Sequence, residues 1–250
     1  MAETSNSPSL RLYTQGAELF KKGQYDEAIK LFKQATETDP KFYRAWAYLG
    51  MAYAQQGQLD PAIEAYRKCI DVEPTYHKAF NNIGELYRRK GLLDYAAMVF
   101  KMASEIDPSH SHYFYNLGIT YFEIGMHTQA EEALSRAYAL DPRDFDYATE
   151  LAQVLFTLRK YEAAAETLQN YLTAVPDHER AAETRARISM LKRLAEQHRA
   201  LARQAASADQ HKSEIRKAPI EEDAPAEEGA QTKIVENPPE KGPEPPPPKA

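Results

Sequence analysis

The sequence predicts an all-α solenoid of helical hairpins, and three regularities support this fold class. Eight of the ten glycines fall into two series in which successive glycines are 34 residues apart, and five prolines recur at the same interval. Apolar residues between them recur at helical intervals. A period of about 20 to 50 residues is typical of stacked repeats, in which each unit buries its apolar face against its neighbours. The three series are Gly16, Gly50, Gly84 and Gly118; Gly23, Gly57, Gly91 and Gly125; and Pro40, Pro74, Pro108, Pro142 and Pro176.

Five units follow from this period, and each is expected to hold two helices. In the second unit, Trp46, Leu49 and Tyr53 mark one apolar helix face, and Ile63 and Tyr66 lie on a second. The glycine between the helices suits a left-handed C-cap, and the proline after the second helix ends it. The expected units are 9–42, 43–76, 77–110, 111–144 and 145–178.

The first glycine of each of the first four units lies inside the first helix, as Gly50 does in YLGMAY. At such a position glycine costs about 1 kcal/mol relative to alanine unless a close backbone approach requires it. We therefore expect the two helices of each hairpin to touch there.

The run from Trp46 to Pro74, WAYLGMAYAQQGQLDPAIEAYRKCIDVEP, resembles a tetratricopeptide repeat. This resemblance covers residues 9–178 and implies a right-handed superhelix whose concave groove, lined by the first helices, binds peptides or protein segments. The fifth unit departs most from the family pattern, with Ala152 and Arg159 in place of glycines and Tyr171 in place of a small residue. Positions of the second unit on the pattern are Trp46, Leu49, Gly50, Tyr53, Ala62, Tyr66, Cys69 and Pro74.

The segments outside the repeats have different compositions. Residues 1–8 are expected to be a flexible N-terminus. Residues 179–211 carry apolar residues at helical spacing without glycine or proline, which predicts a helix that caps the last repeat and then projects. Residues 212–250 hold nine prolines and many acidic residues, so we expect a disordered acidic tail that serves as a tether, as a ligand for a proline-binding domain, or as an occluder of a basic groove.

Composition excludes several classes of function. The formal net charge of -6 argues against nucleic acid as the main partner. Cys69 is the single cysteine and stands where the repeat favours a small residue, so it is expected to be a buried core thiol. The first ten residues do not resemble a secretory signal, and no apolar run approaches the roughly 18 residues of a membrane span. A cytoplasmic location is expected.

The groove is predicted from the positions that line it in the family. Asn82 and Asn116 share the sixth place of successive units and resemble an asparagine ladder, in which side-chain amides hold a peptide backbone. Basic residues of units two and three favour an acidic ligand, whereas Asp146 and Glu150 make unit five acidic. Phe122 and Phe156 add apolar anchors. The predicted groove residues are Arg44, Tyr48, Lys78, Asn81, Asn82, Arg88, Arg89, His112, Tyr115, Asn116 and Phe122.

These patterns favour a non-enzymatic adaptor or scaffold that binds an extended protein segment with acidic residues. The sequence holds no phosphate-binding glycine loop, no histidine pair at metal spacing and no nucleophile elbow, so neither an enzyme, a cofactor nor a metal site is expected. Two alternatives stay open. One is an assembly or secretion chaperone that holds a client segment, and the other is a self-assembling structural protein that forms a homo-oligomer through the repeats or the 179–208 helix.

Overall fold

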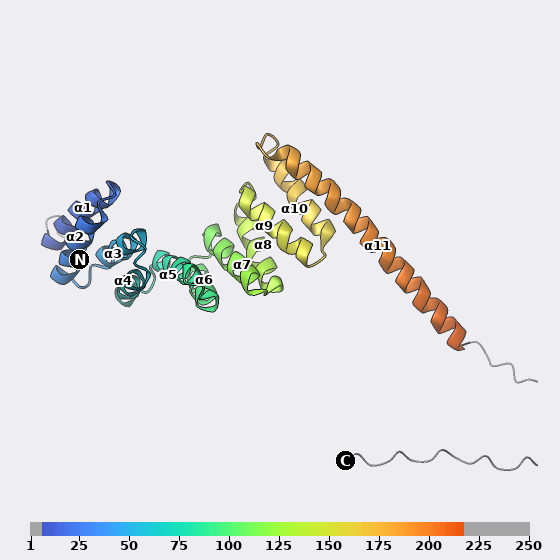
Figure 1. Ribbon diagram of the computed structural model, residues 1–250, viewed down its shortest axis with the longest axis horizontal. Coiled ribbons are helices and arrows are strands. Elements are labelled where there is room, and N and C mark those ends of the chain that lie inside the picture. The colour runs from blue at the N-terminus through green and yellow to red at the C-terminus, as the bar shows by residue number, and fades with distance from the viewer. Residues whose placement is uncertain (1–6, 218–250) are drawn as a thin grey trace, which may run out of the picture. The chain divides into compact units, whose positions relative to one another are not determined.

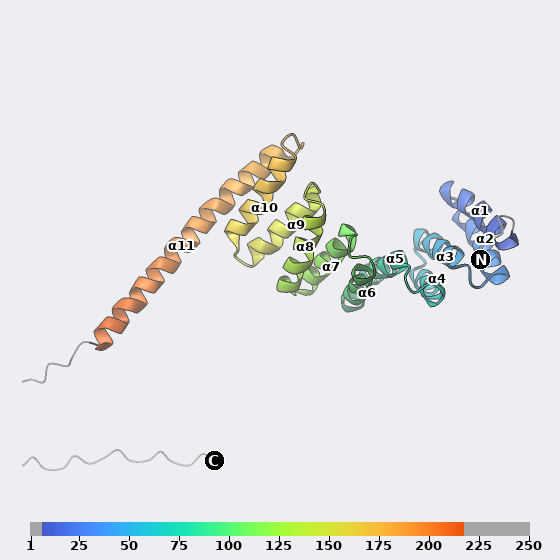
Figure 2. The same cartoon turned by 180° about the vertical axis from the view of Figure 1, so that it is seen from behind.

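A computed structural model describes residues 7–217 of the chain, and within that range it consists of eleven α-helices without strands (Figure 1). The first ten form five antiparallel hairpins, and successive hairpins pack side by side in chain order, as the view from behind also shows (Figure 2). The helices are α1 (Pro8–Lys21), α2 (Tyr25–Thr38), α3 (Tyr43–Gln55), α4 (Leu59–Val72), α5 (His77–Arg89), α6 (Leu93–Ile106), α7 (Ser111–Ile124), α8 (His127–Leu140), α9 (Phe145–Thr157), α10 (Tyr161–Ala174) and α11 (Ala181–Lys217).

Each hairpin turn contains one residue in the left-handed conformation. In the first four hairpins this residue is the second glycine of the unit, with φ between 73° and 90°. In the fifth hairpin Arg159 takes the same role at φ 58°, although this conformation is costly for a residue with a Cβ. The turn geometry is therefore kept in all five units, with or without glycine.

The glycine inside the first helix allows the close approach that the sequence predicts. A Cβ on Gly84 would lie 2.6 Å from the ring of Phe100 on the partner helix, and a Cβ on Gly16 would lie 2.8 Å from the ring of Phe32. In unit five Ala152 fills this place and is fully buried, and Tyr171 of the same unit is 1% exposed. The fifth hairpin thus has a closed core of its own.

The last helix extends the core of the solenoid. Ala181, Ile188 and Leu191 of α11 are buried in one cluster with Leu168 and Leu172 of α10. The chain divides into two compact units after Arg203, and the repeats and the first part of α11 belong to the first of them. That the later part of the helix projects from the repeats stays a prediction.

The ends of the described range correct two boundaries. Ser7 caps α1 by accepting a hydrogen bond from the Leu10 N–H at 3.2 Å, and Pro8 is the first helical residue, so residues 7 and 8 belong to the fold. The α11 helix continues to Lys217, past the expected start of the tail at residue 212, because the first helix-breaking residue is Pro219. The remaining predictions for 1–6 and 218–250 lie outside the described residues.

Candidate functional site

The first helices α1, α3, α5, α7 and α9 share one side of the solenoid, and we call their exposed side the inner face. Here the sixth residue of one unit, counted from the start of that unit, lies next to the fifth residue of the preceding unit. The rings of Tyr48 and Tyr13 are 5.1 Å apart in this way, and Asn116 lies next to Asn81. What stands at the fifth place therefore decides whether the sixth is covered.

Asn82 faces a small residue and stays accessible. The preceding fifth place is Ala47, which is buried and leaves room beside α5. Asn82 donates a hydrogen bond from Nδ2 to the hydroxyl of Tyr66 at 3.0 Å. Because burial raises the pKa of Tyr66, this hydroxyl remains protonated near neutral pH. The amide of Asn82 is thus held in a fixed orientation on the inner face.

A pocket of about 310 Å³ opens beside Asn82, between α3 and α5. We call it the central pocket. Its lining combines polar and apolar side chains, and the guanidinium of Arg89 donates to the carbonyl of Ala54 at 3.4 Å. Of the predicted groove residues it brings together Asn82 and Arg89. Its lining residues are Met51, Ala54, Gln55, Tyr66, Asn82, Glu85, Leu86 and Arg89.

Asn116 is placed differently from Asn82. Its side chain is 4% exposed, and its Nδ2 donates to Oδ1 of Asn81 at 2.9 Å. Asn81 in turn donates to the carboxylate of Glu85 at 3.1 Å. The two predicted ladder residues are therefore not displayed alike: the amide of Asn116 is committed to a buried network that joins α5 to α7.

The predicted basic residues are also divided. Arg44, Lys78 and Arg89 are exposed, and Arg44 donates from Nε to the hydroxyl of Tyr43 at 3.2 Å. Arg88 lies 3.8 Å from the carboxylate of Glu123 on α7, so part of its charge is compensated. Arg44, Lys78 and Arg89 therefore supply the cationic character of the inner face in units two and three.

The aromatic residues of the predicted groove belong to packing contacts. Tyr48 lies in an aromatic cluster with Tyr13, Phe20 and Phe32. Tyr115 is half-buried between the rings of Tyr147, at 4.9 Å, and the exposed His112, at 5.9 Å. Phe122 is half-buried, with its ring 5.3 Å from that of His127. Each leaves only part of one ring open to a ligand.

At the far end of the inner face, α9 and α11 enclose a second pocket of about 240 Å³, which we call the end pocket. Asp146 and Glu150 enter it from α9, and Arg180, Glu183 and Arg187 enter it from the α11 side. The guanidinium of Arg187 donates to Oε1 of Gln153 at 2.7 Å. Charges of both signs therefore line this pocket.

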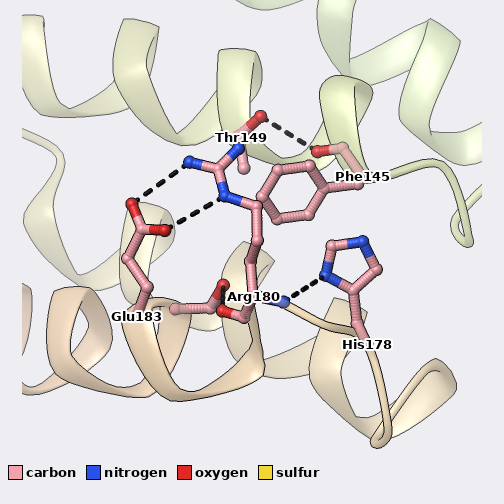
Figure 3. A network of polar contacts seen from close by, with 6 residues as sticks. Phe145, Thr149, His178, Arg180 and Glu183 are labelled. Atoms are coloured by element: carbon pink, nitrogen blue, oxygen red, sulfur yellow. Dashed lines mark hydrogen bonds and ion pairs between the residues drawn. The ribbon is translucent and has the colours of Figure 1, made fainter.

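Arg180 is held by several groups at once (Figure 3). Its guanidinium lies 4.8 Å from the centre of the Phe145 ring and donates two hydrogen bonds to Glu183, at 3.0 and 3.1 Å. The Arg180 backbone N–H donates to Nδ1 of His178, whose ring stacks on Phe145 at 4.5 Å. The stacking of Arg180 and His178 on Phe145 joins the start of α11 to α9, whereas the ion pair with Glu183 lies within the first turn of α11 and holds the guanidinium in place.

Glu150 titrates abnormally because of this cover. Burial raises its pKa, the nearby carboxylate of Asp146 raises it further, and the guanidinium of Arg187 opposes both. Burial likewise raises the pKa of Tyr115 to about 12, with a further contribution from Glu150. The sixth-place carboxylate of unit five is thus partly withdrawn from solvent.

The α11 residues of the end pocket were not predicted as site residues. The signal lay in the period itself, because Arg180 stands one repeat period after Asp146 and Thr184 stands one repeat period after Glu150. The start of α11 therefore takes the place of the first helix of a sixth unit. Its side chains at the second and sixth places face α9 as α9 faces α7.

Groups suited to chemistry are sparse among residues 7–217. No cluster of three or more His, Cys, Asp or Glu side chains there is arranged to hold a metal ion. Cys69 is buried, and burial raises the pKa of its thiol to about 12, which keeps it protonated. Across the same residues, no helix combines the length and apolar character that crossing a bilayer requires.

Comparison with known proteins identifies the family. A family profile described as the Cilia and flagella-associated protein 70 C-terminal domain matches residues 41–216, and a profile described as TPR repeat matches residues 16–57. The chain belongs to the tetratricopeptide repeat family of that C-terminal domain. The matched range runs from unit two into α11, so the last helix is part of the family's domain. No curated protein sequence matches the chain.

Solved structures share the tetratricopeptide fold at low sequence identity. MamA from Desulfovibrio magneticus RS-1 is 19% identical, with a TM-score of 0.61 over 69% of this chain and 98% of that one. The pilF protein of Pseudomonas aeruginosa is 21% identical, with a TM-score of 0.58 over 73% and 91%. YrrB, described as a TPR protein with an unusual peptide-binding site, is 17% identical, with a TM-score of 0.59 over 71% and 92%.

Proposed function

We propose that this tetratricopeptide repeat protein is a non-enzymatic adaptor that binds an extended, acidic protein segment on its inner face. The observation that carries the proposal is the central pocket, whose lining includes both Asn82 and Arg89. Family membership supports a role in protein interaction, and the description of YrrB supplies a peptide-binding site on the same fold. A cytoplasmic location is part of this proposal.

The central pocket offers three kinds of contact to an extended segment. Asn82 uses Nδ2 on Tyr66, and its Oδ1 can accept a peptide N–H irrespective of the side-chain sequence. Met51 is half-buried and offers apolar contact to a side chain of the ligand. Arg89 donates one N–H to the Ala54 carbonyl and offers its remaining N–H donors to a carboxylate, a geometry that allows two-point recognition.

Charge gives the ligand a direction along the inner face. Arg44, Lys78 and Arg89 are exposed in units two and three, so acidic residues of the ligand are expected there. Toward unit five, a mainly apolar pocket of about 440 Å³ is lined by Phe156, Ala186 and Met190 among others. An apolar residue of the same segment is expected at that end, beyond the end pocket.

The test uses inner-face charge reversal with a matched outer-face control. The first variant combines Lys78→Glu with Arg89→Glu, and the control combines Lys30→Glu with Lys68→Glu on the exposed sides of α2 and α4. Both change the net charge equally. Fluorescence anisotropy with designed acidic peptides of about a dozen residues should show a loss of affinity of at least about tenfold for the first variant and little change for the control.

Each outcome decides between functions. Binding of acidic peptides that the inner-face variant loses and the control keeps supports the adaptor. Binding that depends on the inner face but not on peptide charge favours the chaperone alternative, in which unfolded client segments are held through their backbone. Equal effects of the two variants, or absence of binding by the native chain, overturns the inner-face proposal.

A further inference from the structure

Helix α6 carries an exposed apolar stripe on the outer side of the solenoid. Tyr95 is 55% exposed, Met98 is 54% exposed and Met102 is 40% exposed, and Leu92 just before the helix is 39% exposed. Their spacing of three or four residues places them along one face of the helix. We call these four residues the α6 stripe. Large apolar side chains so exposed in a row mark interaction surfaces.

The corresponding positions of the other second helices are almost entirely polar. One repeat period further along the chain, the places of Tyr95, Met98 and Met102 are occupied in α8 by a glutamine, a glutamate and an arginine. The stripe is therefore not required by the repeat, since the neighbouring hairpin folds without it. The matching triplets are Glu27, Lys30 and Gln34; Pro61, Glu64 and Lys68; Gln129, Glu132 and Arg136; and Ala163, Glu166 and Asn170.

We propose that the α6 stripe binds the α6 stripe of a second copy of this chain in an antiparallel, two-fold contact. Asp94 and Lys101 are separated by about two helical turns and so lie along one edge of the stripe. When the Met98 side chains of both copies meet at the two-fold axis, Tyr95 of one copy packs against Met102 of the other. Asp94 of each copy then comes beside Lys101 of the other. The edge is thus complementary to itself.

The existing contacts of these charges leave them available. Lys101 lies 3.9 Å from Glu105, and both side chains are largely exposed, so this pair is weak and readily exchanged. Asp94 lies in the first turn of α6, where its negative charge interacts favourably with the N-terminal end of the helix dipole. Its side chain is exposed to water. A second copy offers each of them an opposite charge at the rim of an apolar contact.

The size of the stripe sets the strength of the contact. The four side chains expose roughly 400 Å² of apolar surface per copy, given about 200 Å² for a large free side chain. Two copies with their polar rims would bury about 1,000 to 1,200 Å², the lower end for a specific interface. The chain is therefore expected to be monomeric at about 1 μM and to dimerise as its concentration approaches about 100 μM. This contact is separate from the inner face.

The first test replaces the stripe with residues that an adjacent hairpin already carries. The triple variant Tyr95→Gln, Met98→Glu, Met102→Arg copies the outer face of α8 onto α6, so it should fold. The matched control makes Glu64→Gln on α4, at the place that corresponds to Met98. Sedimentation velocity on the full chain from about 1 μM to about 500 μM should show a monomer–dimer equilibrium in the native chain and control, and monomer alone in the triple variant.

A charge exchange tests the register. Asp94→Lys alone and Lys101→Asp alone place like charges opposite each other, so each variant should dimerise at least about fivefold more weakly. An equimolar mixture of the two single variants should dimerise as well as the native chain, because opposite charges then face each other in the mixed dimer. Thermal unfolding of each variant alone checks that α6 remains folded.

The results separate clearly. Dimerisation that the triple variant loses and the mixed charge variants recover supports the proposal. A native chain that stays monomeric to about 500 μM, or a dimer that the triple variant retains, overturns it. Failure of the mixture to recover dimerisation overturns the antiparallel register.

Discussion

Units three and five both present their sixth residue on the inner face, and both side chains are half-buried, but the groups around them differ. Asn82 lies beside the small residue Ala47 and lines the central pocket, where the oxygen of its amide can accept a hydrogen bond from a ligand. Glu150 lies in the end pocket, where α11 brings Arg187 and Glu183 over it. The same place in the repeat therefore presents different atoms to a ligand, depending on the residues of the neighbouring unit. The neighbouring unit decides this as much as the residue itself.

The largest effect on stability is expected from weakening the packing of α11 against unit five. Leu191 of α11 is fully buried against α10, so Leu191→Ala should lower the free energy of unfolding by about 3 kcal/mol. Urea denaturation followed by circular dichroism measures the change. Met190 is the adjacent residue and is 45% exposed, so Met190→Ala should cost much less, about 0.5 kcal/mol. Equal losses for the two variants would show that α11 does not close unit five by packing.

A smaller effect is expected from exchanging the small residue inside the first helix of each hairpin. Gly84→Ala brings a Cβ to 2.6 Å from Phe100 and should destabilise the fold by about 1 to 3 kcal/mol, despite the better helix propensity of alanine. The reverse change in unit five, Ala152→Gly, should cost about 1 kcal/mol through helix propensity and somewhat more through the lost contacts of its buried methyl group. Thermal melts of both variants check this, and a stabilised Gly84→Ala protein would contradict the close packing of α5 and α6.

Ligand binding should distinguish the two adjacent arginines of α5. Arg88 is paired with Glu123 at 3.8 Å, whereas Arg89 points into the central pocket. Arg89→Ala is expected to weaken binding of an acidic peptide by about tenfold, and Arg88→Ala by about threefold or less. Isothermal titration at low and moderate ionic strength measures both. A larger loss for Arg88→Ala would place the ligand nearer α7 than proposed.

The smallest effect is expected in the pH dependence of stability that Glu150 contributes in the end pocket. The pKa of Glu150 is raised in the folded protein by burial and by Asp146, so folding favours its protonated form. Its contribution is therefore most favourable below the pKa of the unfolded state and is lost as pH rises through the folded value. Relative to Glu150→Gln, the native chain should lose stability as the pH rises above the ordinary pKa of a glutamate carboxyl. Parallel stability curves in urea would contradict the burial of this carboxylate.

The fold was predictable because its determinants repeat. Glycine and proline at a fixed period encode turns and helix ends, and the clash that a Cβ on Gly84 would make explains why glycine is needed inside a helix. Arg159 shows that the signal is sufficient but not necessary, since the fifth turn forms without glycine. Helix limits shifted only where capping at Ser7 and the absence of a breaker before Pro219 decided them.

The site was less predictable because it depends on pairs of residues in different units. Counting within a repeat gave Asn82 and Asn116 the same role, but the fifth place of the preceding unit differs. Asn81 stands at that place before Asn116 and covers it, whereas Ala47 stands there before Asn82. Arg187 likewise lies in the segment that the sequence predicts as a capping helix, and its place beside Glu150 was not predicted. The spacing of residues in the sequence predicts which positions lie on the inner face. Contacts between neighbouring units determine which of those side chains remain accessible to a ligand.

The docking of α11 on unit five also makes the two ends of the solenoid unequal in their dynamics. In a linear array each hairpin is supported only by its neighbours, so opening proceeds from the less supported end. Helix α1 packs mainly on α2 and α3, whereas α9 and α10 are clamped by buried residues of α11. Amide hydrogens of α1 and α2 should therefore exchange fastest among the hairpins, with protection rising toward α10. Opening of the first hairpin would then set the timescale on which a segment enters or leaves the central pocket from that side.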